Sequence, residues 1–256
     1  MQPLAGQAAL VTGASRGIGK AIALHLAAAG VRVAVAARSA GDLDRVVDEI
    51  RGKGGDAFAL PGTVTDPGLA AQIVSAAMDR FGALSLLVNN AGIPGPYGPV
   101  GTLDPLEWWT AQQVNVFAPF AFMNAAIPGM RDRRAGRIVN IVSNAALQPI
   151  PYLSAYAVSK NTVIRITETV DLELRESGVK AFALHPGNIT TDMARGTVAS
   201  ADAQRWFGER IAMIRDRDPL ESAADLKRCC YAVAAIAAGT CDTVSGRYLD
   251  LWKDIP

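Results

Sequence analysis

The chain has 256 residues, of which 50% are hydrophobic and only 6% aromatic, with 25 basic and 24 acidic side chains. This length suffices for one large domain with a substantial core, and the wealth of small aliphatic residues is typical of α/β proteins, whose buried parallel strands are apolar runs. The net charge of +1 argues against a nucleic-acid-binding surface and against a polybasic membrane patch.

The three cysteines, Cys229, Cys230 and Cys241, are an odd number without the spacing of a disulfide framework, so we expect buried, reduced thiols. The N-terminus lacks the charged and apolar regions of a signal peptide. The apolar segment 21–37 is interrupted by a histidine, a glycine and an arginine, which argues against a membrane span. We therefore expect a soluble, cytoplasmic protein. The two histidines lack ligand spacing, so we expect no metal.

Short β-branched runs alternate along the chain with longer helical patterns. In order, the predicted strands cover 8–12, 31–37, 57–60, 84–89, 137–143, 179–184 and 246–251. The predicted helices cover 17–29, 43–53, 67–81, 105–131, 152–177 and 223–238. Repeated β-α-β units imply right-handed crossovers and a mostly parallel sheet with helices on both faces. Since no linker or repeat divides the chain, we predict a single domain over residues 1–256.

Ligands of such sheets bind at the carboxyl ends of the strands, so the chemistry is expected in the loops after strands one, four, five and six. Two connections break the regular pattern. Segment 93–99 is rich in proline and glycine, and segment 188–218 is long for a connection. A long connection is often a lid, which is our interpretation of 188–218; the alternative is a disordered or functionless insertion.

The first strand leads into a glycine-rich loop, Thr12-Gly-Ala-Ser-Arg-Gly-Ile-Gly19. Gly13 permits a tight turn, Gly17 permits close approach of the backbone to phosphate, and Gly19 permits close packing of helix and sheet. The following helix offers free N–H groups and the positive end of its dipole to a pyrophosphate. The spacing G-x-x-x-G-x-G differs from the common dinucleotide fingerprint, yet its place in a βαβ unit predicts dinucleotide binding.

The end of the second strand bears on which dinucleotide binds. An NAD site usually has an acidic residue there, but this strand ends in Ala37 and is followed by Arg38. Arg16 of the glycine loop is expected to approach the same ribose. Two guanidinium groups suit a 2′-phosphate, so we predict NADP(H), with NAD(H) less favoured. The alternative is that Arg38 is a solvated residue at a strand end.

Tyr156 and Lys160 are four residues apart and share one face of a predicted helix. Bringing a tyrosine pKa from about 10 to near 7 requires about 4 kcal/mol, and an ammonium about 5 Å away supplies roughly 3 kcal/mol at an effective dielectric near 20. Ser143, at the end of the fifth strand, is a candidate to hold a substrate oxygen. Asn115 is unusual inside an apolar helix: it is either a satisfied core amide or the holder of a water in a proton relay.

Taken together, these motifs resemble those of the classical short-chain dehydrogenases/reductases over nearly the whole chain. The matching motifs are Thr12–Gly19, Asn89-Asn-Ala-Gly92, Asn115, Ser143, Tyr156-Ala-Val-Ser-Lys160, and Pro186-Gly187 followed by Thr191. The resemblance implies one Rossmann-like, doubly wound domain with seven parallel strands, and dimers or tetramers formed through helices 105–131 and 152–177. It implies a catalytic tetrad of Asn115, Ser143, Tyr156 and Lys160. The implied cofactor-binding residues are Gly13, Ser15, Arg16, Gly17, Ile18, Gly19, Arg38, Val64, Asn90, Ala91, Gly92, Tyr156, Lys160, Pro186, Gly187, Ile189 and Thr191.

Three departures from the family pattern stand out. Thr63-Val-Thr65 replaces the usual Asp-Val-Thr after the third strand, Asn144 replaces a second serine, and the C-terminal segment 246–254 lacks the paired glycines. We predict an NADP(H)-dependent oxidoreductase that transfers hydride between nicotinamide and a carbonyl or secondary alcohol. The substrate stays open among 3-oxoacyl thioesters, polyols and small ketones. The alternatives are a non-catalytic NADP-binding regulator and an isomerase or dehydratase of the extended branch.

Overall fold

The computed structural model describes residues 3–255, and within them one seven-stranded sheet has the order β3-β2-β1-β4-β5-β6-β7 with every pair parallel. The order reverses between β1 and β4, which is the topological switch point of a doubly wound sheet. The predicted α/β fold class is therefore confirmed. The strands are β1 Ala8–Thr12, β2 Arg32–Ala37, β3 Ala57–Pro61, β4 Leu86–Asn89, β5 Gly136–Ile141, β6 Val179–His185 and β7 Tyr248–Asp250.

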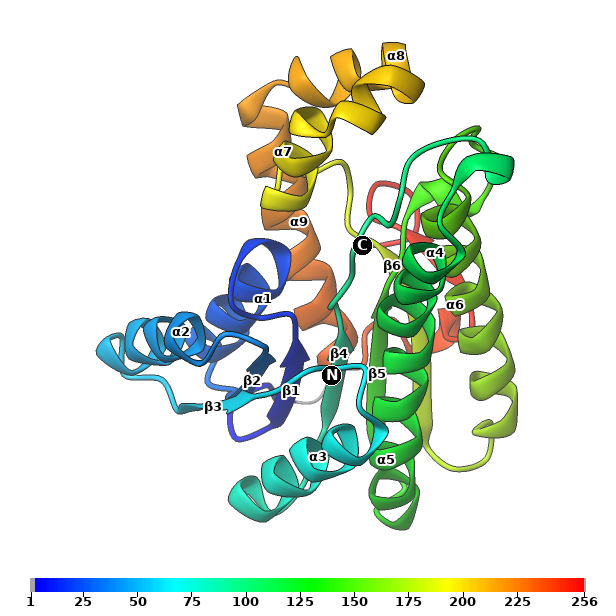
Figure 1. Ribbon diagram of the computed structural model, residues 1–256. Helices are drawn as coiled ribbons and strands as arrows, with labels where there is room; N and C mark the ends of the chain where they lie inside the picture. Colours follow the sequence, from blue (N-terminus) through cyan, green and yellow to red (C-terminus); the bar gives the residue numbers. More distant parts are fainter. Residues whose placement is uncertain (1–2, 256) are drawn as a thin grey trace.

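Helices cover both faces of the sheet (Figure 1). Along β1, Ala9 and Val11 face a first layer of helices, whereas Ala8 and Leu10 face a second layer on the other side of the sheet. The first layer consists of α1 Gly17–Ala28, α2 Ala40–Gly52 and α9 Pro219–Ala237. The second consists of α3 Pro67–Phe81, α5 Ala118–Asp132 and α6 Ser154–Glu173, with α4 Pro105–Gln112 preceding α5.

Local signals explain where several helices begin and end. Asp66 caps α3 by accepting hydrogen bonds from the N–H groups of Gly68 and Leu69, and Gly82 ends it with a φ of 76°. Both signals are visible in the sequence, and the predicted bounds of this helix were correct. Helix α2 begins three residues earlier than expected because Ser39 accepts a hydrogen bond from the N–H of Asp42.

Two predicted segments differ from the structure. The segment 188–218 is largely helical, with α7 Asp192–Ala199 and α8 Ala201–Arg215, so the expectation of a long loop was wrong. Thr191 and Ser200 each accept a hydrogen bond from a helical N–H group, and these caps are why the polar segment forms helices. The predicted helix 105–131 contains a π-helical turn at Gln113–Phe117, which places Asn115 in an irregular part of the helix.

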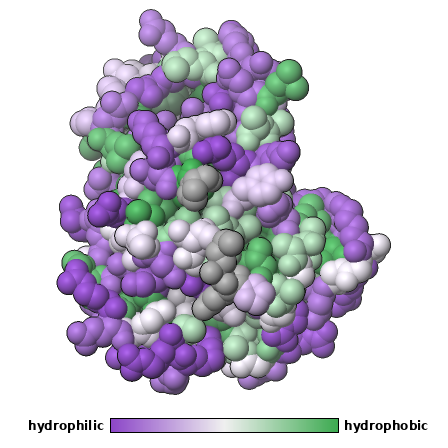
Figure 2. All heavy atoms as spheres, turned by 180° about the vertical axis from the view of Figure 1, so that it is seen from behind, coloured by the Kyte–Doolittle hydropathy of each residue, from purple (hydrophilic) through white to green (hydrophobic). Residues whose placement is uncertain are grey.

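The helices α7 and α8 lie together beyond one end of the sheet, on the side where α1 begins (Figure 1). This is the edge formed by the carboxyl ends of the strands. Seen from behind the view of Figure 1, the surface shows apolar residues as separate areas among hydrophilic ones (Figure 2). Among residues 3–255 no helix is both long and apolar enough to cross a bilayer. All three cysteines are buried free thiols, as expected.

Candidate functional site

The glycine loop after β1 is tied to the loop after β4. The amide of Asn90 donates to the carbonyl oxygens of Thr12, at 3.0 Å, and Gly13, at 3.2 Å. A side chain at Gly13 would place its Cβ 2.8 Å from the Cα of Ala91, and Gly13 has a φ of +65°. A Cβ at Gly19 would collide with the Asn90 amide and the Gly13 carbonyl. The glycines therefore let two loops and a helix meet at the switch point.

The N-terminus of α1 is suited to an anion. Arg16 precedes the helix in an extended conformation, no side chain caps the helix, and its first turn contains no acidic residue. The first N–H groups of α1 thus lack side-chain partners, and the helix dipole favours negative charge there. Gly17, with a φ of +56°, keeps the approach open. This arrangement fits the diphosphate of a dinucleotide.

The two arginines expected at a 2′-phosphate have different surroundings. Arg38 follows the end of β2, is exposed, and has no ion pair within the described residues. The side chain of Arg16 instead points to α7, where its Nε lies 3.5 Å from a carboxylate oxygen of Asp192. Asp192 also pairs with Arg195. In this structure Arg16 therefore links the glycine loop to α7, and Arg38 is the arginine available at the end of β2.

Lys160 lies behind Tyr156, with its Nζ 5.7 Å from the centre of the tyrosine ring. The ammonium donates a hydrogen bond to the Ile141 carbonyl at 2.9 Å. A Cβ at Gly92 would lie 3.5 Å from this Nζ and 3.3 Å from Oδ1 of Asn115, so the loop after β4 lies close to both side chains. The helix α6, the end of β5 and the π-helical turn thus bring Tyr156, Lys160 and Asn115 to one place.

The Asn115 side chain is held by protein partners. It accepts from the N–H of Ile93 at 2.9 Å and donates to the Ile93 carbonyl at 2.8 Å and to Oγ of Ser159 at 2.9 Å. Ser159 in turn donates to the carbonyl of Tyr156 at 2.7 Å. The geometry supports the interpretation of a satisfied core amide, which fixes the loop after β4 against the helix that carries the tyrosine.

Burial governs the titration of Tyr156 and Lys160 in the protein without its coenzyme. Burial raises the pKa of Tyr156, and this effect outweighs the hydrogen bond to Ser143, which lowers it. Burial also lowers the pKa of Lys160 to about 8. In the protein without its coenzyme, burial penalises charge on both groups, and both are shifted toward their uncharged forms. That Lys160 and a bound nicotinamide together lower the tyrosine pKa stays a prediction.

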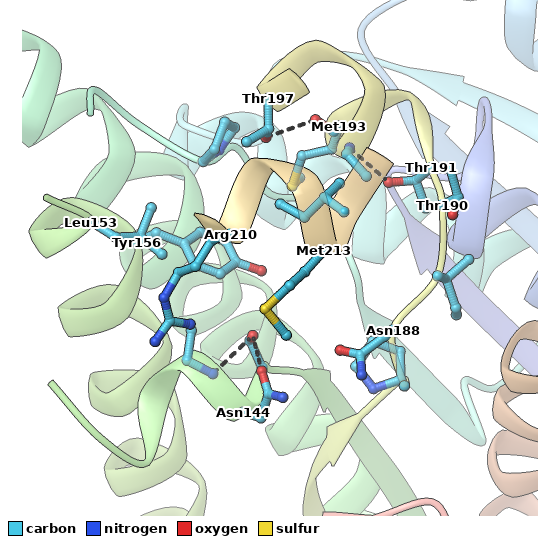
Figure 3. A pocket seen from close by; sticks show the side chains of 18 of the residues that line it. Asn144, Leu153, Tyr156, Asn188, Thr190, Thr191, Met193, Thr197, Arg210 and Met213 are labelled. Atoms are coloured by element: carbon cyan, nitrogen blue, oxygen red, sulfur yellow. Dashed lines mark hydrogen bonds between the residues drawn. The ribbon is translucent and has the colours of Figure 1, made fainter. Parts of the chain in front are cut away.

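Ser143 lies beyond the end of β5, where its Oγ accepts a hydrogen bond from the N–H of Ala145 at 3.1 Å. Its hydroxyl and that of Tyr156 belong to one cavity of about 380 Å³, shown in Figure 3. The loop after β6 and the helices α7 and α8 form the other walls of this cavity. The predicted cofactor residues that line it are Ile18, Tyr156, Pro186, Gly187, Ile189 and Thr191.

The other predicted cofactor residues lie outside the wall of this cavity. These residues lie along the edge formed by the carboxyl ends of the strands, where Arg38 is exposed after β2 and Val64 is buried after β3. The group consists of Gly13, Ser15, Arg16, Gly17, Gly19, Arg38, Val64, Asn90, Ala91, Gly92 and Lys160. A dinucleotide is long enough to extend from the cavity along this edge, so the separation fits an extended ligand.

The segment 188–218 contacts the loop 93–99 across the cavity. Tyr97 and Thr197 share a hydrogen bond of 2.7 Å between their hydroxyl groups. The rings of Tyr97 and Phe207 lie 5.7 Å apart, and those of Tyr152 and Trp206 lie 5.3 Å apart. These contacts place α7 and α8 over Tyr156.

Sequence reasoning missed Asp225, a buried carboxylate on α9. It accepts from the N–H of Asn188 at 2.7 Å, from Arg217 at 2.9 Å and from the Trp252 indole at 2.9 Å. A Cβ at Gly187 would lie 2.7 Å from this carboxylate. Asp225 thereby connects the loop after β6, the end of segment 188–218 and the C-terminal segment. No local pattern marks it, because its partners are distant in sequence.

Comparison with known proteins identifies the class. The model of the short chain dehydrogenase family matches residues 7–202, and the chain belongs to this family. It is 32% identical to a short chain dehydrogenase of Pseudocercospora fijiensis, covering 98% of this chain and 82% of the relative. It is 40% identical to a 3-oxoacyl-[acyl-carrier-protein] reductase of Synechocystis, covering 75% of this chain and 78% of the relative.

A solved structure of an actinorhodin polyketide ketoreductase variant with NADPH superimposes with a TM-score of 0.86 at 30% identity, covering 98% of this chain and 97% of the other. The similarity therefore extends through α7, α8 and α9, beyond the residues that the family model matches.

Proposed function

We propose that the chain is an NADP(H)-dependent oxidoreductase that interconverts a carbonyl group and a secondary alcohol. The observation that carries this proposal is the shared cavity, in which the hydroxyl groups of Ser143 and Tyr156 face the loop after β6 beside the start of α1. The name and bound coenzyme of the actinorhodin ketoreductase structure agree with it.

The coenzyme would occupy the edge of the sheet between α1 and the loop after β6. The start of α1 would hold its diphosphate, and Lys160 would reach its nicotinamide ribose. Asn90, Ala91 and Gly92 would line its adenosine side. When bound, a nicotinamide supplies or accepts the hydride.

The side chains at the cavity handle the substrate oxygen and its proton. In the reducing direction Ser143 holds the carbonyl oxygen, and Oη of Tyr156 donates the proton to it. Because burial raises the pKa of Tyr156, the phenol carries its proton at neutral pH and can donate it. A positioned proton donor of this kind contributes about 10²–10⁴-fold to the rate. Lys160 supports the proton transfer electrostatically, and Asn115 holds the surrounding loop and helix in register.

The preference for NADP(H) is proposed from the missing carboxylate after β2 and the exposed Arg38. A charge-assisted contact to a 2′-phosphate contributes about 1.5–3 kcal/mol, so we expect KM for NADPH to lie about tenfold or more below that for NADH. Steady-state kinetics with both coenzymes checks this, and Arg38→Gln should remove most of the difference. A lower KM for NADH would contradict the proposal.

The proposal is tested by Tyr156→Phe. We expect turnover in an NADPH-oxidation assay over a panel of carbonyl compounds to fall at least about 10²-fold, since the proton donor is lost. NADPH binding, followed by fluorescence, should stay measurable. Tyr231→Phe, on the outer surface of α9, is the matched control. Turnover that survives Tyr156→Phe would overturn the assignment, and a product with the redox state of the substrate would favour an isomerase or dehydratase.

We also propose that α7 and α8 act as a lid over the substrate, and that the chain assembles as a dimer or tetramer through α4, α5 and α6.

A further inference from the structure

The charged side chains in the wall of the cavity are all basic. Its wall includes two arginines, Arg210 and Arg217, and no carboxylate or lysine. Arg217 is neutralised, because it pairs with Asp225 at 2.9 Å and with Glu221 at 3.8 Å. Arg210 has no ion pair and no hydrogen bond among residues 3–255, and its guanidinium carbon lies 5.8 Å from the centre of the Phe207 ring. The cavity therefore carries one uncompensated positive charge.

Arg210 is well placed to meet a substrate. It stands on α8, and Figure 3 shows Arg210 and Met213 on the lid side of the hollow that also contains Tyr156. The wall of the cavity also includes apolar side chains from the same and neighbouring segments, namely Ile150, Leu153, Met193, Phe207, Met213 and Ile214. A ligand that fits this cavity has an apolar body, a carbonyl oxygen at Tyr156 and a negative charge on the lid side.

We propose that Arg210 selects carbonyl substrates that carry an anionic group, a carboxylate or a phosphate, at the end of the apolar body remote from the carbonyl. This inference rests on the proposed reductase function. It follows from charge complementarity, since Arg210 lines the cavity, has no carboxylate partner among the described residues, and forms charge-assisted hydrogen bonds with anions. It assigns to the lid a role in substrate choice.

The chain contains a matched control in Arg205. It also stands on α8 and also contacts an aromatic ring, that of Trp206, at 4.8 Å, and it has no ion pair among the described residues. Arg205 lines a separate hollow together with the acidic side chains of Asp104, Glu107 and Asp202. A change at Arg205 thus removes the same charge from the same helix without touching the catalytic cavity.

The test compares an aliphatic keto acid with its methyl ester in NADPH-oxidation assays. For the wild type we expect kcat/KM to favour the acid by about tenfold, and we expect Arg210→Met to remove this preference, since a charge-assisted contact is lost while the side chain keeps its length. Arg205→Met should retain it. Added salt should reduce the preference of the wild type and leave Arg210→Met unaffected.

Further comparisons distinguish a preference for phosphate from a preference for carboxylate. An acyl thioester whose thiol portion bears a phosphate is compared with the same thioester without it, so a phosphate preference and a carboxylate preference are scored separately. NADPH affinity is measured for all three proteins. If Arg210→Met weakens NADPH binding and lowers acid and ester turnover equally, Arg210 contacts the coenzyme and the inference is wrong.

Equal kcat/KM of the wild type for charged and uncharged substrates would also overturn the inference about Arg210, while leaving the proposed reductase function intact. If neither the wild type nor either variant oxidises NADPH with any of the carbonyl compounds, the proposed function itself fails.

Discussion

At the scale of one residue, the buried charge of Lys160 lowers the stability of the folded protein. Its side chain is buried, its ammonium donates to the Ile141 carbonyl, and burial lowers its pKa to about 8 from the ordinary 10.5. Below pH 8 the lysine is charged in both states, so the folded protein bears the full cost of the buried charge, about 3 kcal/mol at 1.36 kcal/mol per pKa unit. The cost shrinks as the pH rises from 8 to 10.5, because in this range the folded protein releases the lysine proton whereas the unfolded chain still holds it.

We therefore expect Lys160→Met to abolish turnover and to raise the free energy of unfolding at pH 7 by about 1–3 kcal/mol, with part of the gain lost through the missing hydrogen bond. Urea unfolding at pH 7 and pH 10 checks this, and the gain should be smaller at pH 10. Lys227→Met, on the exposed side of α9, is the control and should show no such pH dependence. A less stable variant at pH 7 would contradict the argument.

At the scale of secondary-structure elements, α9 fixes the segments around the site through the carboxylate of Asp225. Through one buried carboxylate it holds the N–H of Asn188, the guanidinium of Arg217 and the indole of Trp252. Its helix packs against α1, whose first turn would hold the coenzyme diphosphate. The position of the loop after β6 is thus set from α9.

Asp225→Ala leaves one guanidinium and two N–H donors without their partner, so we expect a loss of about 2–4 kcal/mol in the free energy of unfolding. NADPH affinity should fall more than kcat, because the loop beside the nicotinamide is displaced while the tyrosine is not. Thermal unfolding, NADPH fluorescence titration and kinetics measure the three effects. Asp216→Ala, which breaks only the exposed pair with Arg215, is the control and should change stability by less than about 0.5 kcal/mol.

At the scale of the whole molecule, large apolar side chains stand exposed on α4, α5 and α6. Leu106 is 75% exposed, Trp109 57% and Phe120 50%, and Val158 and Leu172 are exposed on α6. A monomer rarely leaves such residues grouped on neighbouring helices in contact with water. This surface supports the proposed assembly of two or four copies.

We expect the wild type to have at least the mass of a dimer in light scattering at micromolar concentration. A variant with Trp109→Glu and Phe120→Glu should be smaller, since two buried charges oppose the apolar contact. Leu220→Glu, an equally exposed leucine at the start of α9, is the control and should keep the wild-type mass. A wild type that is monomeric under these conditions would refute the proposal.

Local signals allowed much of the fold to be predicted. The apolar runs of β1 and β4, the caps of α3 and the glycines before α1 all act within a few residues, so their effects are visible in the chain. The helices α7 and α8 were missed because their caps, Thr191 and Ser200, lie in a polar segment without strong apolar periodicity. The π-helical turn at Asn115 depends on the contacts with Ile93 and Ser159, which no local pattern reveals.

The amino-acid sequence by itself determined the alternation of strands and helices, the glycine loop and the pairing of Tyr156 with Lys160 on one helix, because each follows from short-range periodicity and spacing. Only the tertiary structure decided the direction of the tyrosine pKa, the role of Asp225 and the uncompensated charge of Arg210. Burial and charge pairing depend on segments far apart in the chain, which folding alone brings together.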